Sequence, residues 1–469
     1  MENSRKSSSR NLLHRVADVL VPVVPEGATV LLGLSGGVDS VVLLHLLHQL
    51  SPQYSWCLSA FHVHHGISPR ANEWAVFCTD LCAHYKIPFQ LERVDIVPLR
   101  DLGVEAAARQ LRHATLARQN ADFIAFAHHQ DDQVETLLLQ LLRGAGVRGA
   151  AAMPFARRAA QIAASLLMEE GGSPRPPVLL RPLLNTSRAE LLEYAAQYSL
   201  QWVEDESNAD DAYPRNFLRH RVLPILEQRF PAYRATLARS ARHFAEANAL
   251  LDELAQQDGG LCASPTGEGI LSLEVALLQS LSQSRAKNLM RYFLATRGAP
   301  MPDSVRLQEM LHQLCHARTD AALCVAFGDW EIRRYRGRVY ALLSHPQPAG
   351  DPCIPWHGES TLELAALNGT LYFEPAVGQG VSLARLQQGK VNIHARRGGE
   401  TIQPDAARPR RTLKNLLQER GIPPWQRDKL PLLFCGHDLV CVPGVVTEAA
   451  YQAHPGERGV LVSWRIRTA

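Results

Sequence analysis

Apolar residues recur in two different patterns along the first part of the chain. Short apolar runs of strand length are each followed by a longer stretch whose apolar residues recur at helical spacing. The expected strands are Thr29–Gly33, Cys57–Val63, Phe89–Val94 and Phe123–Ala127, and the expected helices are Val41–Leu50, Asn72–Tyr85, Val104–Gln119 and Asp131–Arg143. Strands that alternate with helices predict an α/β fold with a doubly wound parallel sheet, which binds ligands at the carboxyl ends of its strands.

The pattern changes in the remainder of the chain. It is helical over 224–314, with one long helix expected over Tyr233–Ala255. A β-rich piece follows, in which Trp330–Leu343 predicts a hairpin. His345–Gly350 is a predicted linker, and a helix is expected over Thr412–Arg420. We therefore expect three domains, which are an α/β domain over 1–223, a mainly helical domain over 224–345 and a small α+β domain over 351–469.

Composition and cysteine usage predict the compartment. Of the 469 residues, 46% are hydrophobic and 20% are charged, which is typical of a globular protein. No apolar stretch is long enough for a transmembrane helix, and the first ten residues lack the apolar core of a signal peptide. The nine cysteines are scattered and odd in number, which indicates reduced thiols. We therefore expect a cytoplasmic protein with no membrane partner. The net charge of +3 is too small to indicate nucleic acid by itself.

One short polar turn separates two apolar runs between Leu31 and Leu47. It lies where the first strand becomes a helix, so backbone N–H groups and the helix dipole would favour an anion such as a phosphate. The turn has no lysine for a Walker-type loop and no Gly-x-Gly-x-x-Gly for a dinucleotide fingerprint. An ordinary Gly-rich turn is the alternative. The hexapeptide Ser-Gly-Gly-Val-Asp-Ser resembles the pyrophosphate loop (PP-loop) of ATP-pyrophosphatases, which implies an ATP site at Ser35, Gly36, Gly37, Val38, Asp39 and Ser40.

A second polar cluster, at 127–136, follows the fourth expected strand and has the sequence AHHQDDQVET. Asp131 and Glu135 are four residues apart and share a helix face, with Asp132 beside them. Charge placement at a helix N-terminus explains one or two acids. The whole cluster is also suited to position a magnesium ion, an amine or a base. A zinc site is disfavoured because no cysteine or third histidine lies at ligand spacing from His128-His129.

Several motifs together are similar to those of the tRNA(Ile)-lysidine synthases, and they cover nearly the whole chain. In chain order they are Ser35–Ser40, His64–Gly66, Glu105–Arg109 with Arg112, Asp131–Thr136, Glu204–Asn208 and Arg215–Arg219. The stretch Leu413–Phe434 resembles the C-terminal domain of the longer, three-domain members. Asp405–Arg411 departs from the Gly- and Lys-rich sequence that the family has there, but it keeps the positive charge. The resemblance implies a PP-loop ATP-pyrophosphatase domain followed by two tRNA-binding domains.

The resemblance implies a ligase that joins L-lysine to the wobble cytidine of the isoleucine tRNA with a CAU anticodon. ATP, with Mg²⁺, would adenylate the cytidine, and the release of pyrophosphate and then of AMP would leave lysidine. The residues that the resemblance assigns to this reaction are Asp39 for the metal, Asp131, Asp132 and Glu135 for the amines and the proton of lysine, and Arg112 with Arg109 for the α-phosphate or the RNA. Two exposed arginines on an amphipathic helix are an equally good interpretation of the last pair.

Basic residues are expected to bind the tRNA backbone. They are Arg143, Arg148, Arg215, Arg219, Arg410, Arg411 and Lys414. The oligomeric state stays open, with a homodimer among the alternatives. One alternative function is a tRNA 2-thiocytidine synthetase, which would need closely spaced Cys-x-x-Cys pairs, whereas the nearest pair here is Cys78 and Cys82. The other alternative is a nucleotide-binding RNA adaptor without turnover, which could lose the acids that this chain keeps.

Overall fold

The structure is a computed structural model, and it describes residues 12–64, 66, 68–94, 115, 119–158, 177–204, 206, 210–263, 271–318, 323–344 and 353–466. The chain forms two compact units, the first from Met1–Gly259 and Leu281–Asp303 and the second from Gly260–Ser280 and Ser304–Ala469. Arg109, Arg112, most of the predicted helix Val104–Gln119 and the predicted linker His345–Gly350 lie outside the described residues. No described helix is both long and apolar enough to cross a membrane.

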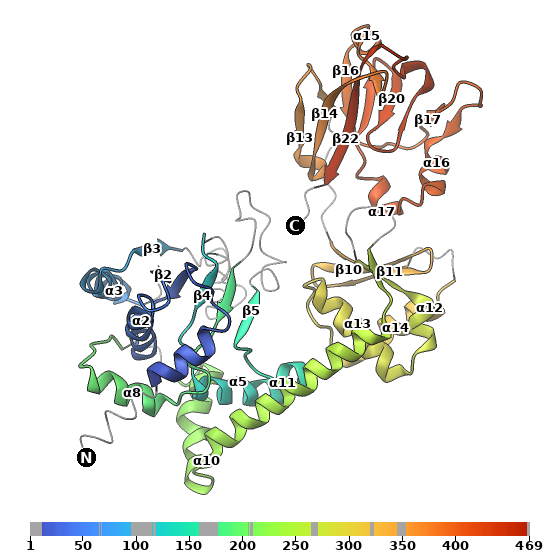
Figure 1. Cartoon of the computed structure of the whole chain (residues 1–469). Helices are drawn as coiled ribbons and strands as arrows, with labels where there is room; N and C mark the ends of the chain where they lie inside the picture. Colours follow the sequence, from blue (N-terminus) through green and yellow to red (C-terminus); the bar gives the residue numbers. More distant parts are fainter. Residues whose placement is uncertain are drawn as a thin grey trace. The chain divides into compact units, whose positions relative to one another are not determined.

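A six-stranded sheet forms the centre of the first unit (Figure 1). Its strands are β1 (Thr29–Gly33), β2 (Cys57–His64), β3 (Phe89–Arg93), β4 (Phe123–Ala125), β5 (Ala156–Arg158) and β6 (Val178–Leu180). Their order is β3-β2-β1-β4-β6-β5, and every neighbouring pair is parallel except β5 and β6. The chain extends the sheet from β1 in one direction and then, with β4, in the other. This confirms the doubly wound α/β prediction, and the switch point between β1 and β4 is where such sheets bind ligands.

The first unit contains the helices that the apolar spacing predicted after β1, β2 and β4 and over 233–255, together with further helices. They are α2 (Val38–Leu50), α3 (Ala71–Tyr85), α5 (Gln130–Leu142), α6 (Val147–Ala150), α8 (Arg188–Gln197), α9 (Pro214–Phe217), the π-helical turn η3 (Leu218–Val222), α10 (Leu223–Arg229), α11 (Tyr233–Asp258) and α13 (Gln283–Thr296). The apolar side chains of α2 are buried in one core with those of β1 and α8. α2 begins three residues before the predicted Val41, because Gly37 is its N-cap and Val38–Ser40 form its first turn.

The long helix α11 lies along α5 and α6 (Figure 1). A small core of Val134, Leu223 and Tyr233 joins α5, α10 and α11, and a second small core joins α5, α6 and α11. The sequence predicted this helix over Tyr233–Ala255, three residues shorter than observed. These contacts hold the segment that follows the sheet directly against α5, the helix that begins at the carboxyl end of β4.

The first part of the second unit combines an antiparallel sheet with two helices. The sheet order is β7-β8-β11-β10-β9. These elements are β7 (Leu261–Ala263), β8 (Leu271–Glu274), α12 (Val275–Ser280), α14 (Ser304–His316), β9 (Cys324–Phe327), β10 (Trp330–Tyr335) and β11 (Arg338–Leu343). The predicted hairpin is β10 and β11. The prediction of helix throughout 224–314 was wrong at β7 and β8, because these short strands form by pairing with each other and with β11.

The C-terminal part of the second unit is mostly antiparallel sheet. One sheet contains β12 (Cys353–Pro355), β16 (Val391–His394), β19 (Leu432–Cys435), β20 (Asp438–Val442) and β21 (Val446–Thr447), and another contains β13 (Thr361–Leu364), β14 (Gly369–Val377), β22 (Arg458–Ile466) and β15 (Val381–Ser382). A two-stranded sheet of β17 (Thr401–Ile402) and β18 (Arg411–Thr412) precedes α16 (Leu413–Glu419). α16 ends just before Gly421, whose φ of +76° suits only glycine well.

Candidate active site

The loop Ser35–Ser40 leads from β1 into α2 and is shaped by its own hydroxyl groups. The Ser40 hydroxyl donates to Gly37 O (2.9 Å) and accepts from the backbone N–H of Ser35 (3.3 Å). Gly37 is the N-cap residue of α2 and has no side chain that could cap it, so the first N–H groups of the helix are open to a ligand. This is the arrangement of an anion site at a helix N-terminus.

The two glycines of the loop have different surroundings. Gly36 is buried, its φ is +87°, and its carbonyl accepts from the backbone N–H of Val203 (3.0 Å). A Cβ at Gly36 would lie 2.8 Å from Val203 Cγ2 and 3.3 Å from Cys78 Sγ. At Gly37 the φ is −71° and the nearest atom to an added Cβ is Ser35 Oγ, at 3.6 Å. The fold therefore requires glycine at Gly36 but not at Gly37.

His129, the N-cap residue of α5, lies among three carboxylates and is only 2% exposed. Its Nε2 is 3.6 Å from Asp39 Oδ2 and from Asp132 Oδ2, and its Nδ1 is 3.7 Å from Asp131 Oδ2. Burial by itself would lower the pKa of His129, but the nearby carboxylates outweigh it and raise the pKa above its ordinary value. His129 thus links the PP-loop to the acids of α5. Sequence analysis included His129 in the polar cluster but gave it no role, because burial between two distant segments leaves no local signal.

Glu135 is the most deeply buried acid of the cluster, with 1% of its surface exposed. Arg219 donates to it from Nε (2.8 Å) and from Nη2 (3.0 Å), and Arg215 forms an ion pair with it at 3.0 Å. Burial raises the pKa of Glu135, and its hydrogen bond to Arg219 opposes this rise without cancelling it. Arg215 also donates to Thr136 Oγ1 (3.0 Å). The structure therefore brings two predicted tRNA-binding arginines into the acidic cluster.

Asp39 is the residue of the site best suited to hold a cation beside phosphates. Its Oδ1 is a buried acceptor to which no described residue donates a hydrogen bond. A buried acceptor normally has a hydrogen-bond donor or a bound ion beside it. Carboxylate oxygen is a preferred ligand of Mg²⁺. Among the described residues, no group of three or more His, Cys, Asp or Glu side chains is arranged to hold a metal.

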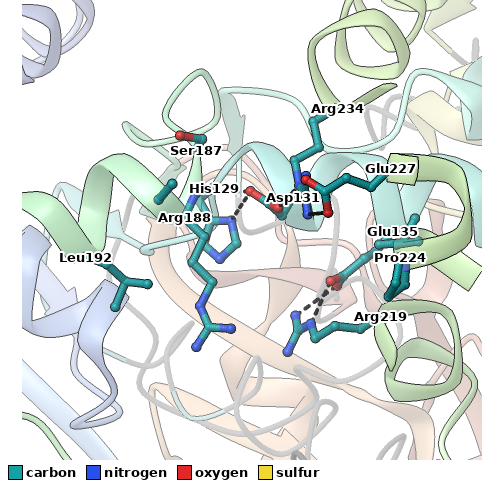
Figure 2. Close-up of a pocket in the computed structure, with 12 residues that line it drawn as sticks. His129, Asp131, Glu135, Ser187, Arg188, Leu192, Arg219, Pro224, Glu227 and Arg234 are labelled. Atoms are coloured by element: carbon teal, nitrogen blue, oxygen red, sulfur yellow. Dashed lines mark hydrogen bonds and ion pairs between the residues drawn. The ribbon is translucent and has the colours of Figure 1, made fainter. Parts of the chain in front are cut away.

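A cavity of about 480 Å³ opens beside the acidic cluster (Figure 2). It is bounded by the start of α5, the start of α8 and the segment from η3 to α11. Its charged lining consists of the carboxylates of Asp131, Glu135 and Glu227, the imidazole of His129 and the guanidinium groups of Arg188, Arg219 and Arg234. A cavity lined by both signs of charge is suited to a zwitterionic ligand. Glu227, Arg188 and Arg234 were not predicted, since they are single charged residues in ordinary helical sequence.

For the other predicted basic residues, no contact with the acidic cluster is described. Arg148 donates to Asp252 on α11 (2.8 Å), and Arg143 is exposed at the end of α5. In the second unit, Arg410 pairs with the buried Glu448 at 3.1 Å. Arg411 pairs with Glu419, whereas Lys414 is exposed on α16.

The histidines and cysteines near β2 have structural environments. His62 is buried and its Nδ1 lies 2.8 Å from the carbonyl of Leu34, at hydrogen-bond distance from the end of β1. His64 contacts Asn72 through Nε2 at 3.1 Å. Cys78 and Cys82 are fully buried on α3, and burial raises the pKa of their thiols to about 12 and about 11. Neither thiol is exposed for chemistry at the site.

Three protein families match successive parts of the chain. The PP-loop domain matches residues 6–226, the TilS substrate binding domain matches residues 273–340, and the TilS substrate C-terminal domain matches residues 391–464. The first match contains the loop Ser35–Ser40 and the acidic helix α5. The second match includes residues of both units, because Leu281–Asp303 belong to the first unit, and the third lies within the second unit.

Curated relatives are similar over nearly the whole chain. The tRNA(Ile)-lysidine synthase of Nitrosomonas europaea is 45% identical over 441 residues, which cover 94% of this chain and 93% of the relative. The enzyme of the same name from Aromatoleum aromaticum is 40% identical and covers 92% of this chain and 96% of its own. The enzyme of the same name from Escherichia coli O157:H7 is 37% identical, and the match covers 93% of this chain and 96% of the relative.

Proposed function

The chain belongs to the tRNA(Ile)-lysidine synthase family, and from this premise we propose that it is an ATP-dependent ligase that forms lysidine. It joins the side-chain amine of L-lysine to the wobble cytidine of the isoleucine tRNA with a CAU anticodon. One observation supports this above all others. Asp39 of the PP-loop and Asp132 of α5 each lie 3.6 Å from the same nitrogen of His129. The ATP loop and the acidic cluster are thus neighbouring halves of one site.

The PP-loop serves the first step, in which the ring carbonyl oxygen of cytidine attacks the α-phosphorus of ATP and pyrophosphate leaves. The open N–H groups at the start of α2 and the hydroxyls of Ser35 and Ser40 bind the departing pyrophosphate. A magnesium ion, when bound, neutralises charge that develops on the phosphates. Asp39 would hold this ion through Oδ1, the buried acceptor to which no described residue donates. The family resemblance makes Arg112 a candidate to bind the α-phosphate or the RNA.

The acidic cluster serves the second step, in which the amine of lysine attacks the adenylated carbon and AMP leaves. A lysine amine has a reference pKa of about 10.4, so it arrives protonated and must lose a proton before it attacks. We assign binding of this ammonium group and acceptance of its proton to Glu135 and Asp132. Glu135 lines the cavity, and Asp132 Oδ1 lies 3.8 Å from Arg219, beyond hydrogen-bond distance.

Exposed basic residues of both units are proposed to bind the tRNA backbone. Arg143 at the end of α5 and Lys414 on α16 are exposed, and neither forms an ion pair with another described residue. Arg410 and Arg411 keep 53% and 37% of their side-chain surface exposed despite their acidic partners, so phosphate can reach them. Such contacts supply affinity and register rather than base identity. We propose the cytoplasm as the compartment, because the eight cysteines with described side chains are free thiols.

The experiment that tests this function supplies unmodified isoleucine tRNA, ATP, Mg²⁺ and each amino acid in turn. We expect AMP and pyrophosphate to form only with tRNA, and the wobble nucleoside to gain the mass of lysine less water. The control tRNA carries uridine at the wobble position and should stay unmodified. Nucleotide binding without any turnover would instead support an RNA adaptor, and sulfur incorporation would support a 2-thiocytidine synthetase.

A further inference from the structure

Both carboxylate oxygens of Asp131 are engaged by protein groups. Oδ1 accepts from Arg234 Nε at 2.6 Å, and Oδ2 accepts from the backbone N–H of Arg188 at 3.0 Å, in the first turn of α8. Figure 2 shows the side chains of Asp131 and Arg234 next to each other. The side chain is 15% exposed. Charge-assisted bonds of this length are among the stronger interactions of a carboxylate. Asp131 therefore connects the starts of three helices, α5, α8 and α11.

Arg234 is engaged just as fully, at the start of α11. Its Nε faces Asp131, while its two terminal nitrogens lie 2.5 and 3.1 Å from the carboxylate of Glu227 on α10. The guanidinium group also lies over the ring of Tyr233, 4.7 Å from its centroid. A planar group with five donors can serve two carboxylates at once, which a lysine ammonium at this place could not reproduce. Arg234 thus fastens α10 and α11 to the acidic end of α5.

The other two acids of α5 are held differently. Asp132 accepts the backbone N–H of His129 through Oδ2, while its Oδ1 has Arg219 only at 3.8 Å. Glu135 lines the cavity, as Asp131 does, and it accepts two hydrogen bonds from Arg219 and pairs with Arg215. Its partners therefore come from η3 and α9, whereas those of Asp131 come from α8 and α11. Their geometry depends on where the first turn of α5 lies, and Asp131 sits in that turn. Residues four apart on one face share a rigid helix, so a shift at Asp131 moves Glu135 as well.

We propose that Arg234 and Asp131 are a pair of positioning residues that set the first turn of α5, and that Asp131 does not itself bind lysine. The pair connects α10 and α11 to α5, the helix that carries the proposed lysine-binding acids Asp132 and Glu135. This inference rests on the proposed function, because it assigns a role within the same reaction. Its consequence is a slower chemical step rather than weaker lysine binding, since small displacements of reacting groups can lower rates by up to about a hundred-fold.

The test compares Arg234→Met, Asp131→Asn and the double variant in the full-length protein. We expect each single variant to lower kcat for lysidine formation about ten- to a hundred-fold. The KM for lysine should stay within about two-fold of the wild-type value, and Arg234→Lys should recover only part of kcat. The double variant should be no slower than either single variant, because both changes remove one shared interaction.

Arg15→Met is the matched control for stability. Arg15 pairs with Glu190 at 2.8 Å and is 39% exposed, close to the 31% of Arg234, but it does not line the cavity. Thermal unfolding of every variant separates loss of folding from loss of rate. If Arg234→Met does not fold, the kcat and the KM for lysine of Asp131→Asn test the proposal, because this substitution keeps the size of the side chain.

Three results would overturn the proposal while the wild type forms lysidine. These are a ten-fold or larger rise in the KM for lysine with Asp131→Asn, an activity of Arg234→Met equal to that of Arg15→Met, and additive losses in the double variant. A wild-type protein that forms no lysidine would instead refute the proposed function itself.

Discussion

A methyl group added at Gly36 and one added at Gly37 should have different consequences, although the two glycines are neighbours in one loop. At Gly36 the φ of +87° costs an L-residue roughly 1–2 kcal/mol. The new Cβ, 2.8 Å from Val203 Cγ2, adds overpacking of about 1–3 kcal/mol. We expect Gly36→Ala to lower the free energy of unfolding of the first unit by about 2–5 kcal/mol.

At Gly37 the same substitution meets no steric obstacle in the protein. The φ is −71° and the nearest atom is 3.6 Å away, which is ordinary van der Waals contact. Only the preference of an N-cap position for glycine over alanine remains, about 1 kcal/mol or less. A large loss of ATP-dependent activity in Gly37→Ala would therefore report a close approach of phosphate to the backbone, rather than a loss of folding.

The assay measures thermal unfolding of both variants with and without ATP, together with tRNA-dependent release of pyrophosphate. A third variant, Gly36→Ala with Val203→Ala, removes the methyl group that the new Cβ would meet. It should recover the part of the lost stability that is due to overpacking but not the part due to φ. Equal stability of Gly36→Ala and Gly37→Ala, or no rescue by Val203→Ala, would refute this account of the loop.

Three further predictions concern the site and the tRNA surface. Asp39→Asn should stay folded but form no AMP with tRNA, because the proposed ligand of the metal loses its charge; near-wild-type AMP formation by the folded variant would contradict this. Glu135→Gln should still allow adenylation while attack by lysine slows about ten- to a hundred-fold, as expected when a charge-assisted hydrogen bond worth about 1.5–3 kcal/mol is lost. Single-turnover reactions with labelled ATP should then accumulate adenylated tRNA, and absence of that species would place Glu135 in the ATP half of the site. Lys414→Gln should weaken tRNA binding and reduce the slope of log Kd against log salt by about one, whereas an unchanged slope would exclude a phosphate contact.

The local sequence was sufficient wherever apolar spacing was unambiguous over a whole element. β1 has the predicted bounds, and α11 begins at the predicted Tyr233. Alternating strands and helices also determined that the loop after β1 and the acids after β4 would share one edge of the sheet, because parallel strands present their carboxyl ends together. The short strands β7 and β8 escaped prediction, since three or four residues carry too little periodicity and their pairing with β11 is a tertiary contact.

Only the tertiary structure decided which cation each carboxylate of the site meets. Spacing on α5 correctly placed Asp131 and Glu135 on one face, yet their partners come from much later in the chain. Asp131 binds Arg234, 103 residues away, and Glu135 binds Arg219, 84 residues away. Periodicity within one helix does not encode how a second helix packs on it, and that packing sets these pairs. The spacing within α5 identified the acids of the site, and the packing of η3 and α11 on α5 decided how their charges are matched.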